Sequence, residues 1–312
     1  MEYHVITTNQ TVLDQKRNIS FQEAYHSFCA GLRLSTRTGK AYRQGVTRFI
    51  SWCAAAGIGR PTREDYSRYL DDMAVTLRPT SQNAYMAAVR RFYQFLEVFY
   101  GWDDITKHFK GAKIDRTNLK DPLTADGARS VLTVPDRSTP QGRRDFALLA
   151  LLLTCGLRTI EITRANWGDL QTYMGRRVLK VQGKGKADKR DFVIIPDRTA
   201  AALEAYRDDL RPGDEDPLFQ SLSHNSRGKR LTTRSLSRIV KEALIAAGYN
   251  SDRLTAHSLR HTAVTLALEG GMTIQEAQAF ARHANITTTT VYAHNLDALK
   301  NQCSQTVANA VF

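Results

Sequence analysis

The residues best suited to chemistry lie near the end of the chain, between positions 254 and 294. His257 and Arg260 are three positions apart, so on a helix they share one face. His283 follows at the end of a second expected helix, and Tyr292 lies on a short third one. A guanidinium binds phosphate oxygens, an imidazole transfers protons near neutral pH, and an activated phenol is a nucleophile. These side chains, in this order, suit chemistry on a phosphodiester.

Two upstream segments extend the set. Residues 155–162 read CGLRTIEI and contain Arg158, while residues 182–186 read QGKGK and contain Lys184. The whole pattern resembles the tyrosine recombinase (phage integrase) family, whose active site reads Arg…Lys…His-x-x-Arg…His…Tyr along the chain. The matching residues in this sequence are Arg158, Lys184, His257, Arg260, His283 and Tyr292.

The resemblance implies a specific reaction. In the family, the tyrosine attacks a DNA phosphorus, forms a 3′-phosphotyrosyl link and releases a 5′-hydroxyl, and the matching nucleophile here is Tyr292. A phenol with a pKa of about 10 is protonated at neutral pH and needs activation. Arg158 and Arg260 match the two arginines of the family motif. Two planar guanidinium forks suit a phosphate that gains charge in the transition state.

The resemblance also indicates which residues move protons. Lys184, at the tip of an expected hairpin, is the general acid for the leaving 5′-oxygen, with Lys186 as the alternative. A neighbouring cation lowers the pKa of an ammonium and makes it a better donor. His257 and His283 hydrogen-bond the phosphate or take the tyrosine proton.

Four further residues lie near these motifs without matching them. His261 and His294 are outside the motif register and are expected to be structural or exposed. Arg282 stands where the family usually has glycine before the second histidine, so this departure concerns the local backbone. Glu161 either steadies a neighbouring basic group or forms an exposed pair with Arg164.

The composition favours a polyanionic partner. The net charge is +13, and residues 16–116 hold 17 Lys and Arg against nine Asp and Glu. A solvated basic surface is the alternative interpretation of this charge. The four cysteines are widely spaced, which predicts a reduced, cytosolic protein without zinc or disulfides. There is no acidic cluster for magnesium and no GxxxxGK[ST] loop, so neither a metal nor a nucleotide cofactor is expected.

Hydrophobic periodicity predicts a mainly α fold with a small β-sheet, arranged in two domains. Residues 1–17 show no period and are expected to form a flexible tail. Residues 18–112 contain four amphipathic helices and resemble the core-binding domain of the family. A polar linker, 113–123, precedes an α+β catalytic domain over 124–312.

Within the catalytic domain, one long helix is expected over 142–162, because its first part is the most apolar stretch of the chain. Strands are expected over 177–182 and 190–195, with the glycine- and lysine-rich hairpin between them. Further helices are expected over 197–210 and 233–247.

Several basic residues fall at outward helical positions and are candidates for contacts with DNA phosphates. These are Arg37, Lys40, Arg43, Arg48, Arg90 and Arg91, to which the hairpin adds Lys186. For any one of them a solubilising surface role is equally compatible with the pattern. The family's C-terminal segment usually packs on a neighbouring protomer; residues 296–312 either do so or fold back on their own domain.

The leading hypothesis is a site-specific DNA recombinase acting as a homo-tetramer on two double-stranded sites, in integration, excision or resolution of a mobile element or replicon. Its architecture resembles minimal Xer-type or transposon-borne members of the family. We expect it in the cytoplasm with the nucleoid, because no apolar run approaches membrane-spanning length. A type IB topoisomerase-like enzyme would use the same chemistry to relax DNA without two sites. A DNA-binding accessory protein without catalysis is the other alternative, and the intact motif series argues against it.

Overall fold

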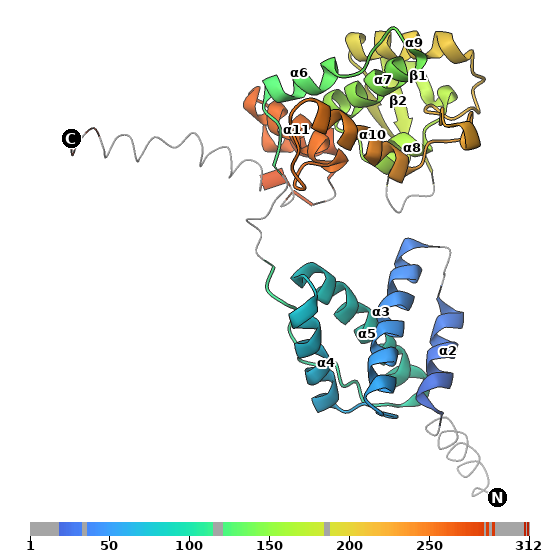
Figure 1. The fold of residues 1–312 in the computed structure, drawn as a ribbon, viewed down its shortest axis with the longest axis vertical. Coiled ribbons are helices and arrows are strands. Elements are labelled where there is room, and N and C mark those ends of the chain that lie inside the picture. Colours follow the sequence, from blue (N-terminus) through green and yellow to red (C-terminus); the bar gives the residue numbers. More distant parts are fainter. Residues whose placement is uncertain are drawn as a thin grey trace, which may run out of the picture. The chain divides into compact units, whose positions relative to one another are not determined.

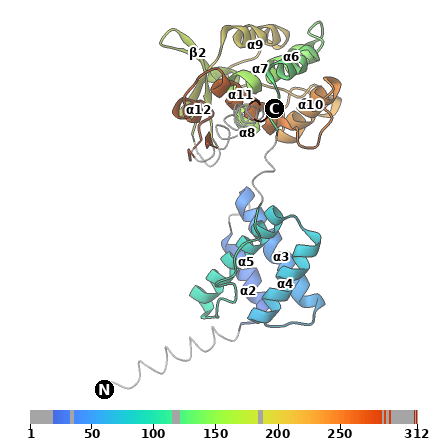
Figure 2. The ribbon, with the colours of Figure 1, turned by 90° about the vertical axis from the view of Figure 1, so that its left-hand side faces the viewer.

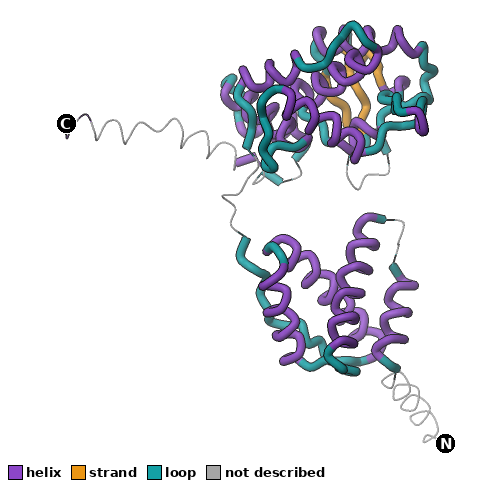
Figure 3. Tube along the Cα trace, viewed as in Figure 1, coloured by secondary structure: helices purple, strands orange, loops and turns teal. Residues whose placement is uncertain are grey.

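The computed structural model describes residues 19–32, 36–114, 121–183, 188–283, 285–286, 289–290, 309 and 311. The chain divides into two compact units, Met1–Asn118 and Leu119–Phe312 (Figure 1). The first unit is helical where it is described, and the second also contains a small sheet (Figure 3). The predicted fold class is therefore confirmed.

Four helices build the described part of the first unit. They are α2 (Phe21–Gly31), α3 (Arg37–Ala55), α4 (Arg63–Thr76) and α5 (Pro79–Tyr100). Their starts follow the expected signals. Ser20 forms a capping box with Glu23 at the start of α2, and Thr62 caps α4 in the same way. Pro79 is the first residue of α5, where its missing N–H is not needed.

Aromatic side chains on the inner faces of α3, α4 and α5 fill the core of this unit. The buried Phe49 ring meets the Tyr69 ring edge-on at a centroid distance of 4.9 Å and the Tyr66 ring at 5.9 Å. Phe92 and Tyr93 of α5 are buried beside them. Such pairs stabilise the core beyond the burial of their area. These rings serve packing, as the sequence indicates.

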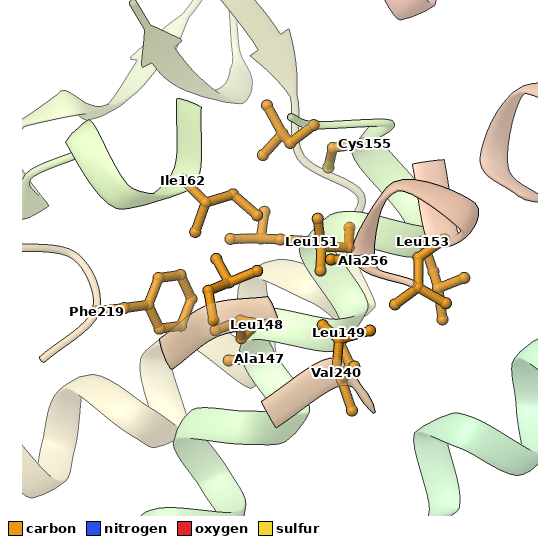
Figure 4. Packing of buried hydrophobic residues seen from close by; sticks show 14 of the residues in the cluster. Ala147, Leu148, Leu149, Leu151, Leu153, Cys155, Ile162, Phe219, Val240 and Ala256 are labelled. Carbon is orange, nitrogen blue, oxygen red and sulfur yellow. The ribbon is translucent and has the colours of Figure 1, made fainter. Parts of the chain in front are cut away.

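Helices also form most of the described part of the second unit. They are α6 (Ala125–Thr133), α7 (Pro140–Cys155), α8 (Thr159–Arg164), α9 (Asp197–Leu210), α10 (Thr233–Ala246), α11 (Ala256–Glu269) and α12 (Ile274–Ala281), with two short 3-10 turns, η1 (Trp167–Asp169) and η2 (His224–Ser226). α7 is central and packs against α9 and α11. Its own Leu148, Leu149, Leu151 and Leu152 are fully buried, and Figure 4 shows the first three among the side chains of the core. A helix that is apolar on all sides belongs inside a core.

The single helix expected over 142–162 is wrong. α7 ends because Gly156 adopts the left-handed conformation, with φ 55° and ψ 35°, which glycine reaches without strain. Arg158 is then the N-cap residue of a separate short helix, α8. A Cβ atom at Gly156 would lie 2.8 Å from the Phe280 ring, so this glycine also lets α12 approach the turn closely. The break moves Arg158 from a helix interior to a helix start.

A three-stranded antiparallel sheet has the order β1-β2-β3. Its strands are β1 (Leu170–Tyr173), β2 (Arg176–Val181) and β3 (Asp191–Ile194). The two expected strands are confirmed, each within one residue of its predicted start. β1 adds a hairpin whose turn residues, Met174 and Gly175, both have positive φ, as a type I′ turn requires. The pairing of Val181 with Asp191 fixes the base of the glycine- and lysine-rich hairpin.

No helix within the described ranges is both long and apolar enough to cross a membrane.

Candidate active site

Arg158 is held at the start of α8 by its own helix. Its backbone N–H donates to Oε2 of Glu161 at 2.8 Å, and its Nη1 donates to Oε1 of the same carboxylate, also at 2.8 Å. This reciprocal contact requires the helix break at Gly156, because only a helix N-terminus leaves these backbone N–H groups unpaired. The Arg158 side chain remains 27% exposed. One edge of the guanidinium can therefore reach a ligand.

Glu161 is the buried anion of the site. Its side chain is 1% exposed, and its Oε2 also accepts a hydrogen bond from Nη2 of Arg282 at 2.7 Å. Burial alone would raise the pKa of Glu161, but the charge of Arg282 and the hydrogen bonds from Arg158 and Arg282 leave that pKa below its ordinary value. The carboxylate is thus ionised and paired, as a buried charge must be. The alternative of an exposed pair with Arg164 is wrong.

Arg260 projects from α11 into the interior and is 2% exposed. Its Nη1 donates to the carbonyl oxygen of Gly156, and its Nη2 donates to the carbonyl oxygen of Ala281. Burial, followed by the positive charge of Arg158, lowers the pKa of Arg260 to about 9. The group is still cationic at neutral pH, and it ties the turn after α7 to the end of α12.

The two predicted arginines converge on the same backbone segments. Arg158 donates from Nη2 to the carbonyl oxygen of Arg282 at 3.0 Å, one residue beyond the carbonyl that Arg260 binds. α11 and α12 pack against each other, and Figure 2 shows both in the second unit with α8. Residues more than 100 positions apart in the chain are therefore neighbours in one cationic site.

His283 follows Arg282 at the end of α12. Its Nδ1 lies 2.9 Å from the hydroxyl of Thr289. Gln278 fixes the backbone on both sides, because its carbonyl accepts from the His283 N–H and its side chain donates to the His283 carbonyl. Burial, then the charges of Arg260, Arg158, His257 and Arg282, lower the pKa of His283 to about 4. The ring is neutral at physiological pH.

His257 is exposed at the start of α11, one turn before Arg260. Its ring packs edge-on against the ring of His261 at a centroid distance of 4.4 Å. His261 itself is buried, in agreement with the structural role expected for it. The charge of His257 contributes to the lowered pKa of His283.

Some predicted residues are not described by the structure. Tyr292, Lys184, Lys186 and His294 lie outside the described residues, as does the side chain of Arg37. Their roles stay predictions.

Of the predicted DNA-binding residues, Lys40, Arg43 and Arg48 are exposed on α3 and line one open cavity of about 770 Å³. Arg91 is exposed on α5. Arg90 does not lie outward as expected: it is half-buried, and its Nη2 donates to the carbonyl of Phe109 at 2.9 Å. That contact explains why an arginine stands on the inner side of α5.

Arg282 is the site residue that sequence reasoning missed. The signal in the sequence is that arginine stands where the family usually has glycine. Its backbone adopts the left-handed conformation, with φ 52° and ψ 46°, in which glycine is favoured. The side chain, however, turns into the site and binds Glu161, a contact that no sequence spacing indicates.

Two protein-family models and several known proteins match this chain. The phage integrase family matches residues 122–298, and the phage integrase N-terminal SAM-like domain matches residues 27–98. Tyrosine recombinase XerC of Pelobacter propionicus is 32% identical over 273 residues, which cover 85% of this chain and 87% of that protein.

Two solved structures share the fold. The XerH site-specific recombinase bound to its palindromic difH substrate in a post-cleavage complex has a TM-score of 0.71 at 19% identity, covering 86% of this chain and 80% of that one. A lambda integrase tetramer bound to a Holliday junction has a TM-score of 0.67 at 16% identity, covering 90% of this chain and 80% of that one.

Proposed function

The chain belongs to the phage integrase family, whose tyrosine recombinases break and rejoin DNA strands, and we propose that Tyr292 carries its covalent intermediate. Site-specific DNA recombination is the activity that family membership gives. In the proposed step the Tyr292 oxygen attacks a DNA phosphorus, and the bond from phosphorus to the 5′-oxygen breaks. The electron pair leaves on the 5′-oxygen, which takes a proton from Lys184. The 3′-phosphotyrosyl link conserves the energy of the broken bond, so resealing requires no nucleotide cofactor.

The convergence of Arg158 and Arg260 is the observation that carries this proposal. Together with Arg282 they bring three guanidinium groups to the end of α12, and two of them, Arg158 and Arg282, share the carboxylate of Glu161. The surplus positive charge suits a phosphate whose oxygens gain charge as the phenol attacks. Donors fixed before the reaction stabilise that charge without reorganisation, which is often the largest catalytic contribution.

The two histidines receive different roles. A ring with a pKa of about 4 is a weak base, so His283 acts as a neutral hydrogen-bond partner of the phosphate. Its Nδ1 lies 2.9 Å from the Thr289 hydroxyl, and this contact orients the ring. His257, exposed at the start of α11, is then the acceptor of the tyrosine proton.

The substrate we propose is double-stranded DNA carrying two recombination sites, bound by a homo-tetramer. The named neighbours, XerH bound to difH and the lambda integrase tetramer on a Holliday junction, support this assembly by fold analogy. Residues 18–112 form the core-binding domain, residues 113–123 the linker and residues 124–312 the catalytic domain. Lys40, Arg43, Arg48 and Arg91 contact phosphates from the first domain. The segment 296–312 packs on a neighbouring protomer, and the natural substrate is a mobile element or replicon.

The test is covalent capture. Duplexes drawn from the DNA that flanks the encoding gene, each nicked just beyond a trial cleavage position, release the short 5′-hydroxyl strand and trap the intermediate. Wild type is expected to give an adduct that survives denaturing electrophoresis, and Tyr292→Phe, which lacks only the phenol oxygen, is expected to give none. Tight DNA binding by wild type without any adduct would overturn the proposal in favour of an accessory protein. Relaxation of supercoiled plasmid lacking the mapped site would instead indicate a topoisomerase-like activity.

A further inference from the structure

We propose that Arg282 is a positioning residue for DNA cleavage: through Glu161 it keeps the Arg158 guanidinium aimed at the scissile phosphate. The inference rests on the proposed function, and it concerns a residue at a position where the family usually has glycine.

The backbone at Arg282 is the first observation. With φ 52° this residue ends α12 in the left-handed region, which residues other than glycine rarely adopt. The turn directs two consecutive carbonyl oxygens at the two predicted catalytic arginines: Arg260 binds that of Ala281, and Arg158 binds that of Arg282. Glycine would form the same turn with less strain. The turn therefore accounts for the carbonyl contacts but not for the arginine side chain.

The side chain has its own set of contacts. It is 13% exposed, and its Nη2 donates to Oε2 of Glu161 at 2.7 Å and to the Gly156 carbonyl at 3.3 Å. Its Nη1 donates to the Phe280 carbonyl at 2.9 Å. One guanidinium thus joins the turn after α7, the first turn of α8 and the end of α12. These are the three segments whose relative placement sets the direction of Arg158.

Because Arg158 and Arg282 share the Glu161 carboxylate, the Arg282 contact affects how much of the Arg158 charge is neutralised. Arg158 takes Oε1 of Glu161 with its side chain, while Arg282 takes Oε2. If the Arg282 side chain were removed, Arg158 would be the sole ion-pair partner of the buried anion among the described residues. Its positive charge would then be balanced by Glu161 and less available to a phosphate. With Arg282 present, the carboxylate is neutralised from the other side.

The experiment uses the full-length chain and the nicked duplex mapped above. Arg282→Gly keeps the left-handed turn and both carbonyls but removes the guanidinium. We expect the single-turnover rate of adduct formation at saturating protein to fall about 10- to 100-fold, by analogy with residues that orient the ligands of a metal ion. DNA affinity should change less than threefold, and methylguanidinium in the buffer should restore part of the rate. Arg282→Lys keeps the positive charge but not the planar guanidinium, so its cleavage rate should lie between those of Arg282→Gly and wild type.

Arg211→Gly is the matched control. Arg211 is also an arginine in the left-handed conformation at a helix C-terminus, with φ 47°, but it is exposed at the end of α9 and takes no part in the hydrogen bonds above. Its cleavage rate should equal that of wild type and should not respond to methylguanidinium. In a Glu161→Gln background the effect of Arg282→Gly should shrink, because the contact through which it acts is already lost.

The outcomes separate the two hypotheses. If wild type forms the adduct and Arg282→Gly forms it equally fast per folded molecule, the positioning role is wrong and the proposed function stands. The positioning role is also rejected if Arg282→Gly cleaves more slowly only because less of it is folded. In that case its Tm would fall with the rate, and methylguanidinium would not restore the rate. If wild type forms no adduct on DNA that it binds, the proposed function itself fails. If Arg282→Gly does not fold, the positioning role is tested on Arg282→Lys, by the same comparison of cleavage rate with Tm.

Discussion

Glu161 shows how the cationic site is made stable. Without it, Arg158, Arg260 and Arg282 would be like charges at close range inside the protein. A buried carboxylate that loses its partners, or partners that lose their carboxylate, destabilise a fold by roughly 3–5 kcal/mol. The site therefore depends on one anion that binds cations from two segments, the start of α8 and the end of α12.

We predict that Glu161→Gln lowers the free energy of unfolding by about 2 kcal/mol at pH 7, less than a fully buried pair because Arg158 is 27% exposed. The folded pKa of Glu161 is depressed, so its contribution is present above the unfolded value of about 4.3 and is lost as pH falls through the lower folded value. Urea unfolding at pH 7 and at pH 3 should therefore show the difference from wild type shrinking in acid.

Asp209→Asn is the control for that substitution. Asp209 forms a two-pronged pair with Arg143 in the same unit, but it lies near the surface, so its loss should cost below about 1 kcal/mol. Equal losses for the two variants would show that Glu161 is an ordinary peripheral ion pair.

His283 provides a prediction that involves no substitution. Its folded pKa of about 4 lies below the unfolded value of 6.5. Between these values the unfolded chain binds the extra proton, so stability is complete above pH 6.5 and decreases as pH falls toward 4. An NMR titration of histidine ring protons should show His283 still neutral at pH 5.5. A His283 midpoint near 6.5 would mean that the ring is not enclosed by the arginines.

The helix break at Gly156 positions the start of α8, and the site is built on it. We predict that Gly156→Ala destabilises the protein by more than about 2 kcal/mol. The left-handed conformation alone disfavours alanine by roughly 1–2 kcal/mol, and the new Cβ would lie 2.8 Å from the Phe280 ring. The displacement of α12 should also slow cleavage. Thermal unfolding and adduct formation measure the two effects.

Gly248→Ala serves as the comparison. Gly248 also has a positive φ, 89°, just beyond α10, but a Cβ there meets no atom within 4 Å in the described structure. Gly248→Ala should lose only the stability that the left-handed backbone conformation costs alanine, and it should keep the wild-type cleavage rate per folded molecule. If both alanine variants lose the same stability and Gly156→Ala cleaves normally, close packing of α12 on the turn is not required.

The elements also show what sequence can and cannot supply. Local signals are sufficient where the chain makes its own contacts: Ser20, Thr62 and Thr273 each cap a helix together with an acidic residue three positions later. They failed at Gly156, because an apolar run followed by a lone glycine is also compatible with one continuous helix. β1 was missed because four mostly exposed residues carry no alternation of burial.

The same limit applies to the site. Arg158, His257, Arg260 and His283 were predicted as candidates because the family motif fixes their order. The shared carboxylate and the inward Arg282 were not, because contacts across more than 100 residues depend on how α8, α11 and α12 pack. Arg90 was misplaced for a similar reason: helical periodicity set it outward, whereas the segment after α5 supplies a carbonyl that draws it inward.

For the molecule as a whole, net charge is the property that follows most directly from the sequence. The net charge is +13. Part of the positive charge is concentrated on α3, where Lys40, Arg43 and Arg48 line the same cavity beside Trp52 and Tyr69. Each phosphate that a protein neutralises releases counterions, so log Kobs falls with log salt by about 0.9 per contact on duplex DNA.

We therefore predict that replacing Lys40, Arg43 and Arg48 together by alanine weakens DNA binding and makes this salt slope shallower by about three. The control replaces Arg78, Lys107 and Lys110, which are exposed in the same unit but do not line the cavity, and changes the net charge by the same amount. Binding isotherms between 50 and 300 mM salt give both slopes, and because about 0.9 is expected per lost phosphate contact, the control should lose much less. If the two triple variants lose equal slope, net charge alone attracts the DNA, and the α3 cavity is not where its backbone lies.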